Sequence, residues 1–356
     1  MNKNFLIFIL LILFISPCVF GETTEENADG EEPAKSEINN DIINEAAIIV
    51  PAPVQYIHVD VSPINDVDVL WEIFLQNPDT STAVDILIKL GRLGKGKRHI
   101  IDNLNNYLMG INLLFKSGSA VNYIVVSACI SALMELGDSS SYPALFSVLY
   151  AGYPEVIASE ANGALDVIPG NLHQFLLNVI LNNPSDEKFA AFRTAVNSER
   201  LSISERGLLA ERALEKSLED DGNDLDLTVM RYAAVNALTR FRWTRANTLA
   251  VRHYYRVQSD YHQNIVPKQR FIEAIACLGA VGNSDAALVL GLQLGLINAR
   301  TETTGAFDPD ITMAIVRALG NIGFHAAFDH LMSVSNLPYP DDIVAAAGEA
   351  INRLKW

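Results

Sequence analysis

The chain has 356 residues, of which 49% are apolar and 19% charged, with 26 Lys and Arg against 42 Asp and Glu and a formal net charge of −16. This length and apolar content allow a sizeable buried interior and exclude a chain that is disordered throughout. The excess of acid opposes binding to nucleic acid or to an anionic membrane through overall charge, because phosphate contacts need a basic surface. The three cysteines are too few for a disulfide framework.

The first 21 residues have the features of a secretory signal peptide. Lys3 precedes an unbroken apolar run over residues 5–15, and a small residue, Gly21, ends the segment. Two alternatives stay open: a retained anchor, although the run is short for a bilayer span of about 20 residues, and a lipoprotein acylated at Cys18. No later stretch has 18 consecutive apolar residues. We therefore expect an exported chain, in the periplasm or cell envelope or secreted, with no transmembrane segment after cleavage.

Two short segments separate this signal from the body of the chain. Residues 22–48 carry nine acidic groups and one lysine with no aromatic residue, a composition that predicts a disordered acidic spacer, with an acidic docking tail as the alternative. Residues 49–62 contain prolines that oppose a helix, and we expect an extended linker lying against the start of the body.

The body, residues 63–356, has a helical pattern throughout. Apolar residues recur every three or four positions, as in Val67, Leu70 and Phe74, and Gly or Asn-Pro interrupts the pattern every 12 to 20 residues. The sequence therefore predicts the all-α class.

The ends of these helices repeat a motif, Leu-x-x-(Leu/Val/Ile)-Gly. Four copies are clear, at residues 90–94, 133–137, 278–282 and 319–323, and looser copies stand at 165–170, 238–241 and near Ile351, with room for a divergent unit around Leu214. We expect each glycine to end its helix in a left-handed turn, with a second amphipathic helix folding back beside the first. Each pair would leave an apolar face uncovered, so neighbouring pairs should stack.

The segment Ala132–Asp138, Ala-Leu-x-x-Leu-Gly-Asp, resembles the core signature of HEAT repeats, and the repeat spacing of 32 to 43 residues is similar to their length. The resemblance covers residues 64–354. It implies an α-solenoid of about seven stacked HEAT-like helix pairs, in the armadillo-like class, with scaffolding by protein-protein interaction as the expected function.

The strongest candidate site is an arginine-rich stretch. No acidic residue lies between Asp226 and Asp260. On a helix predicted over residues 243–257, three arginines fall on one stripe, with apolar residues on the opposite side. The candidate partner-binding residues are Arg242, Trp243, Arg245, Arg252, Tyr255 and Arg256. An alternative is that this stripe pairs within the chain with the acidic loop 219–226.

Other patterns give weaker signals. Residues 91–97 fit Gly-x-x-x-x-Gly-Lys, but Arg98 stands where a phosphate-binding loop needs Ser or Thr. The acidic loop lacks the ligand spacing of an EF-hand, and His325, Asp329 and His330 do not share one helical face. Cys129 and Cys277 lie on apolar stripes, and we expect buried free thiols.

These observations predict a non-catalytic scaffold with a protein partner and without metal, cofactor or nucleic acid. Two alternatives stay open: an enzyme on a HEAT-like fold, and an anion- or glycan-binding solenoid that uses the arginine stripe.

Overall fold

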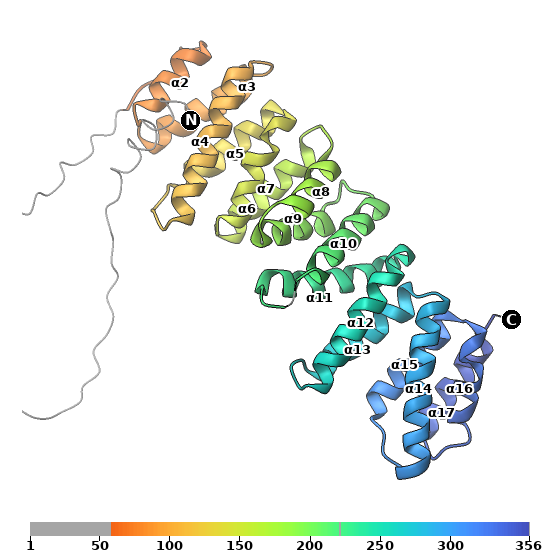
Figure 1. Ribbon diagram of the computed structural model, residues 1–356. Helices are drawn as coiled ribbons and strands as arrows, with labels where there is room; N and C mark the ends of the chain where they lie inside the picture. The colour runs from red at the N-terminus through yellow and green to blue at the C-terminus, as the bar shows by residue number, and fades with distance from the viewer. Residues whose placement is uncertain (1–57, 221, 356) are drawn as a thin grey trace, which may run out of the picture. The chain divides into compact units, whose positions relative to one another are not determined.

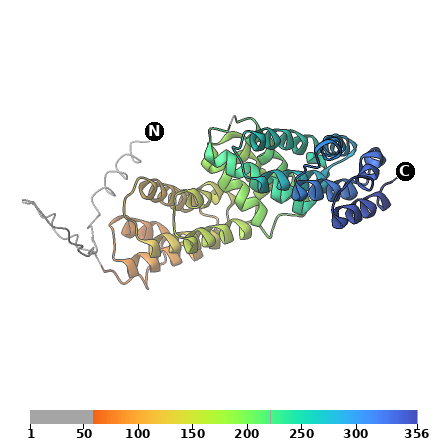
Figure 2. The ribbon, with the colours of Figure 1, turned by 90° about the horizontal axis from the view of Figure 1, so that it is seen from below.

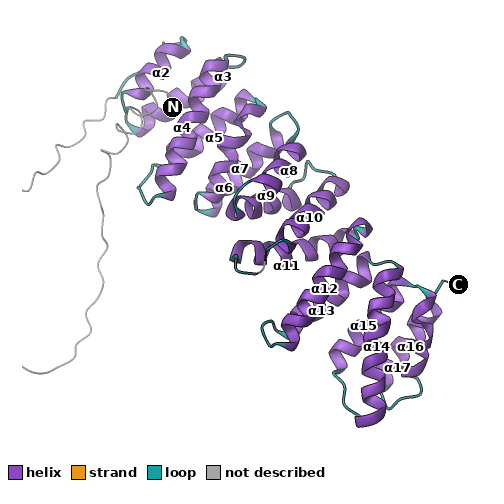
Figure 3. Cartoon of the chain, viewed as in Figure 1, coloured by secondary structure: helices purple, strands orange, loops and turns teal. Residues whose placement is uncertain are grey.

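The computed structural model describes residues 58–220 and 222–355, and this part of the chain is built of helices without a β-strand (Figures 1 and 3). The predicted all-α class is therefore confirmed. The predictions for the signal peptide 1–21, the acidic spacer 22–48 and most of the linker 49–62 lie outside the described residues.

The described residues contain sixteen α-helices and three 3₁₀ turns, joined by loops. They are α2 (Val67–Leu75), α3 (Thr80–Leu93), α4 (Arg98–Lys116), α5 (Tyr123–Leu136), η1 (Ser139–Ser141), α6 (Tyr142–Tyr150), α7 (Glu155–Val167), α8 (Leu172–Asn182), α9 (Ser185–Asn197), α10 (Ile203–Leu218), α11 (Leu225–Phe241), η2 (Thr244–Ala246), α12 (Asn247–His262), α13 (Lys268–Val281), α14 (Ser284–Thr304), α15 (Pro309–Ile322), η3 (His325–Ala327), α16 (Phe328–Val334) and α17 (Asp341–Asn352).

The chain divides after Leu136 into two compact units. In the first unit, α3 packs closely on α5, and the segment before α2 is held against α3. Lys89 of α3 donates hydrogen bonds from its ammonium to three carbonyls of this segment, those of Val61, Ser62 and Ile64, at 2.7 to 2.9 Å. Lys89 is thus a structural residue of the first unit.

In the second unit, the helices form two rows (Figure 2). The odd-numbered helices contact one another in chain order from α9 to α17, and the even-numbered helices do so from α8 to α16. The repeated leucines Leu238, Leu278 and Leu319, on α11, α13 and α15, are fully buried. The repeated leucine of the motif therefore marks the core of the odd-numbered row.

Small residues set the spacing between successive odd-numbered helices. A Cβ atom added at Gly279 would lie 2.8 Å from the Cα atom of Ala318, and one added at Gly320 would lie 2.9 Å from that of Ala350. In the first unit, Gly91 faces the Cα atom of Ala132 in the same way, at 3.1 Å. At these three positions the glycine directly after the repeated leucine thus allows close approach of the next odd-numbered helix.

The glycine that ends the motif has two different roles. Gly137 and Gly323 have φ of 67° and adopt the expected left-handed turn. At Gly94 and Gly282 the prediction of a left-handed turn is wrong, since their φ values are −83° and −71°. A Cβ atom there would lie only 2.5 and 2.3 Å from a carbonyl oxygen of the preceding turn, so lack of space requires glycine at these two positions.

The predicted position of the divergent unit is also wrong. Leu214 lies in α10, an even-numbered helix, whereas the helix that continues the odd-numbered row between α7 and α11 is α9. Polar contacts join α9 to α7 here: Thr194 donates to Asn162 at 3.1 Å and Ser198 donates to Asp166 at 2.5 Å. The sequence predicted a unit in this gap but misplaced its first helix, because side-chain hydrogen bonds replace the Leu-x-x-(Leu/Val/Ile)-Gly motif there.

Candidate functional site

The structure places the six predicted site residues on three consecutive segments of the second unit. Arg242 caps the end of α11 in a left-handed conformation with φ of 50°, Trp243 directly precedes the turn η2 that contains Arg245, and Arg252, Tyr255 and Arg256 lie on α12. The prediction of one helix over 243–257 is wrong, because α12 begins at Asn247. Arg245 therefore does not share a helical stripe with the other two arginines.

Trp243 and Arg245 are anchored to α10. The indole Nε1 of Trp243 donates to the Glu211 carboxylate at 2.6 Å, and Arg245 approaches the same carboxylate at 3.7 Å. The Trp243 ring lies against Gly207, where an added Cβ atom would be 2.6 Å from it. Because Glu211 is buried, losing this bond would leave a buried acceptor without its shortest hydrogen bond. These two residues hold η2 in place.

Arg256 contacts the acidic loop, as the intramolecular alternative foresaw, but through the backbone. Its guanidinium donates to the carbonyl oxygen of Asp220 and lies against Gly222, which has a φ of 94°. Two amides of the loop, those of Gly222 and Asp224, donate to the Asp220 carboxylate at 2.7 and 3.4 Å. Arg256 therefore holds the end of a loop that is organised around Asp220.

Arg252 and Tyr255 remain exposed on α12. No described residue makes an ion pair with Arg252, so its charge faces solvent. On the opposite side of the helix, Ala250, Tyr254 and Val257 are buried, as the pattern predicted. Of the predicted residues, the structure thus leaves Arg242, Arg252 and Tyr255 available to a partner.

Sequence reasoning missed an apolar row on α14. Leu288, Leu292 and Leu296 follow one another at intervals of four residues and are 51%, 64% and 68% exposed. Residues four apart lie on one side of a helix, so the three side chains form one row. The sequence signal was a 21-residue helix that is apolar on all sides, which does not by itself show which side is covered.

This row lies beside the exposed face of α12. The two helices contact each other, and the amide of Gln258 on α12 donates to Gln293 on α14 at 2.8 Å. Tyr255 is three residues before Gln258, and Leu296 is three residues after Gln293, so both flank this bridge on the exposed side. We name Arg252, Tyr255 and the three leucines the α12/α14 surface.

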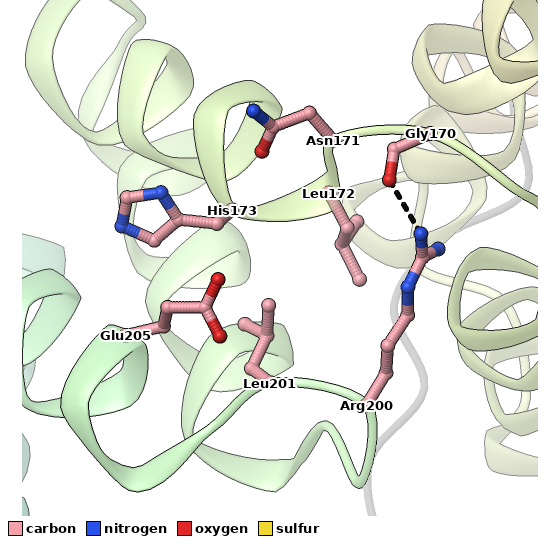
Figure 4. Close-up of a pocket in the computed structure, with 7 residues that line it drawn as sticks. All are labelled: Gly170, Asn171, Leu172, His173, Arg200, Leu201 and Glu205. Atoms are coloured by element: carbon pink, nitrogen blue, oxygen red, sulfur yellow. Dashed lines mark hydrogen bonds between the residues drawn. The ribbon is translucent and has the colours of Figure 1, made fainter.

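A polar pocket of about 410 Å³ lies elsewhere in the second unit (Figure 4). It is lined by Gly170, Asn171, Leu172, His173, Arg200, Leu201 and Glu205.

The charged groups of this pocket already hold the fold together. Arg200 donates to the carbonyls of Ile168 and Gly170 and, at 3.1 Å, to the hydroxyl of Tyr142. Glu205 accepts from the backbone amide of Ser202 at 2.9 Å as part of the capping box of α10, and these bonds to Ser202 lower the pKa of its carboxyl. The pocket is therefore a junction between α8 and α10 whose charged groups have structural partners.

No group of three His, Cys, Asp or Glu side chains among residues 58–220 and 222–355 is arranged to hold a metal ion. His330 instead packs its ring on Gly295 of α14, where an added Cβ atom would be 3.0 Å away. Cys129 and Cys277 are buried and free, as predicted, and burial raises the pKa of both thiols, to about 12 and about 11. Within the described part of the chain, no helix combines the length and apolar character that crossing a membrane requires.

Comparison of the chain with protein-family models and with curated proteins finds no match.

Proposed function

We propose that the chain is an exported, non-catalytic scaffold, an α-solenoid of HEAT-like repeats that binds protein partners in the periplasm or cell envelope. The pairs from α3/α4 to α15/α16 would be its seven repeats, and motif glycines stand at the turn within four of them. The continuous rows of odd- and even-numbered helices in the second unit support this interpretation, since each repeat covers the apolar face of the next.

The observation that carries the proposal is the exposed leucine row of the α12/α14 surface. Contiguous exposed apolar side chains on a soluble protein mark interaction sites. Fully burying a leucine side chain contributes about 1.5 to 3 kcal/mol, so partial burial of three leucines by a partner is a substantial driving force.

The neighbouring charge specifies the kind of partner. Arg252 stands beside the leucine row with its charge unpaired by any described residue, and Tyr255 offers an amphipathic ring at the same place. Arg and Tyr are residues that interfaces favour. An amphipathic helix with an apolar stripe flanked by acidic residues would complement this surface, in the manner of helix-in-groove recognition.

Site-specific photocrosslinking in the native cell tests the proposal. A photoreactive residue at position 292, on α14, should crosslink a protein partner, whereas one at position 156, where Val156 is similarly exposed on α7, should not. The double variant Arg252→Glu, Leu292→Asp should weaken binding of that partner at least tenfold, while Arg193→Glu, an exposed arginine on α9, should leave it unchanged. Equal crosslinking at both positions, or unchanged binding of the double variant, would refute the proposed surface.

Export is tested separately. The mature protein should carry Glu22 at its amino terminus if the signal is cleaved after Gly21. A mature chain that begins with acylated Cys18 would instead support the lipoprotein alternative.

A further inference from the structure

A second group of cationic side chains lies on the covered side of α12, where the sequence indicated only helix packing. Arg231 of α11 is 3% exposed and His253 of α12 is 1% exposed. Nε and Nη1 of Arg231 and both ring nitrogens of His253 are buried without a hydrogen-bond partner in the structure. Four polar atoms in one place are thus withdrawn from water without compensation.

Aromatic contacts hold this group together. The guanidinium of Arg231 lies 5.1 Å from the centre of the Tyr232 ring, and that of Arg270, on α13, lies 4.4 Å from the same centre. The His253 ring meets the Tyr232 ring edge to face at 5.7 Å. The Tyr232 hydroxyl is buried without a hydrogen-bond partner and lies close to Arg231. The Tyr232 ring therefore contacts the guanidinium groups of both Arg231 and Arg270, and its hydroxyl is free to form a hydrogen bond.

The positive charges of this group are not matched by neighbouring carboxylates. Burial and then the nearby Arg256 lower the pKa of Arg231, and burial together with Arg231 and Arg256 lowers the pKa of His253 to about 3. Glu273 is paired with Arg270 at 2.8 Å. Asp260 acts on Arg231 only weakly, and no described carboxylate lies within ion-pair distance of Arg231. The group has an excess of positive charge.

A buried cation that lacks both a counterion and hydrogen bonds is costly, by several kcal/mol for an isolated charge after relaxation. Ordered water can satisfy polar atoms, but it does not neutralise charge. An oxyanion does both, since its oxygens accept from several N–H and O–H donors at once.

We infer that Arg231, Tyr232, His253 and Arg256 form a binding site for an oxyanion, either a free ion such as phosphate or the carboxylate of an organic acid. Arg231 and Arg256 supply the charge and most of the donors, the Tyr232 hydroxyl supplies one donor, and neutral His253 supplies one N–H. The partly exposed side chains of Arg256 and Arg270 connect the site to the surface. The site is distinct from the α12/α14 surface. Anion binding there can be tested independently of the proposed scaffold function.

Anion binding to the full chain tests this inference. Titration calorimetry with inorganic phosphate and with succinate, in chloride buffer of matched ionic strength, should show binding to one site for at least one of the two. The ion that binds more tightly identifies the source of the oxyanion. At a concentration about 100 times the dissociation constant, that ion should raise the melting temperature by about 5 °C over matched chloride.

Substitutions locate the site. Arg231→Met should abolish anion binding while keeping the unfolding temperature in chloride equal to or above that of the wild type, because it removes an uncompensated buried charge. Arg256→Gln, on a partly exposed residue, should weaken binding at least tenfold and serves if the first variant does not fold. The matched control Arg240→Gln, on an exposed arginine of the same helix as Arg231, should bind as the wild type does.

Two results would overturn the inference. One is the absence of binding by both anions beyond the effect of chloride, which would indicate that water alone fills the group. The other is binding that Arg231→Met and Arg256→Gln leave unchanged, which would place any anion elsewhere on the chain.

Discussion

Acidification should destabilise the second unit through one histidine. His253 is buried with Arg231 and Arg256 acting on it, and its pKa falls from 6.5 to about 3 in the folded chain. Between these two values the unfolded chain binds a proton that the folded chain does not, so the free energy of unfolding decreases as the pH falls. The stability is fully present above pH 6.5 and is lost progressively down to about pH 3.

The expected size of the effect is about 1.4 kcal/mol for each pH unit in this range, or about 2 kcal/mol between pH 6.5 and pH 5. Carboxyl groups with lowered pKa values, such as Glu205 and Asp224, lose their contribution only below their ordinary pKa values of 4.5 and 3.8. Between pH 5 and pH 6.5, the change in the free energy of unfolding therefore comes mainly from His253 and little from these carboxyl groups.

Urea unfolding at pH 7.5, 6.5, 5.5 and 5.0, followed by circular dichroism, measures this slope. The variant His253→Leu should lose most of the dependence on pH, whereas His262→Leu, on an exposed histidine of the same helix, should keep it. A wild-type stability that is constant between pH 6.5 and 5, or equal slopes for the two variants, would show that His253 takes up a proton in the folded chain.

Two other predictions concern packing. Gly320→Val should lower the free energy of unfolding by about 1 to 3 kcal/mol through overpacking, because its Cβ atom would lie 2.9 Å from the backbone of α17. Gly348→Ala, where nothing lies within 4 Å of the added Cβ atom, should raise the free energy of unfolding by about 0.5 to 1 kcal/mol. Chemical denaturation measures both changes, and a Gly320→Val variant as stable as the wild type would contradict the close approach. In a Cys18→Ser chain, Cys129 and Cys277 should react with a thiol reagent only after denaturation, because they are buried and their pKa values are raised; rapid labelling of the native chain would contradict this.

The helical class and the ends of several helices followed from local patterns. The spacing of apolar residues and the position of a glycine depend on neighbours in the sequence, so they identified α3, α5, α13 and α15 before their partners in space were known. The same reasoning failed at α9, where polar side chains make the contacts that leucine and glycine make elsewhere.

The sites were less accessible to sequence reasoning. Arg245 was assigned to the helix that contains Arg252, since nothing local shows that residues 244–246 form a separate 3₁₀ turn. Arg231 lies in the stretch between Asp226 and Asp260 that contains no acidic residue, and composition does not distinguish such a buried cation from a surface one. The leucine row of α14 required tertiary structure, since the neighbours of a helix decide which of its apolar sides remains uncovered.

The contacts between small residues have a consequence for protein engineering. Ala318 receives the close approach at Gly279, and two positions later in the same motif Gly320 offers the next one, to Ala350. The helix α15 thus carries both the alanine that receives one close approach and the glycine that makes the next. A second copy of residues 284–323, inserted after Gly323, would meet the first copy without a new steric conflict, so these residues are a natural module for lengthening the two rows of helices in the second unit. A module of residues 324–352 would contain Ala350, which the preceding helix approaches closely, but it has Asn352 where α15 has Gly320. We therefore expect insertion of such a module to leave a gap between its last helix and the next one.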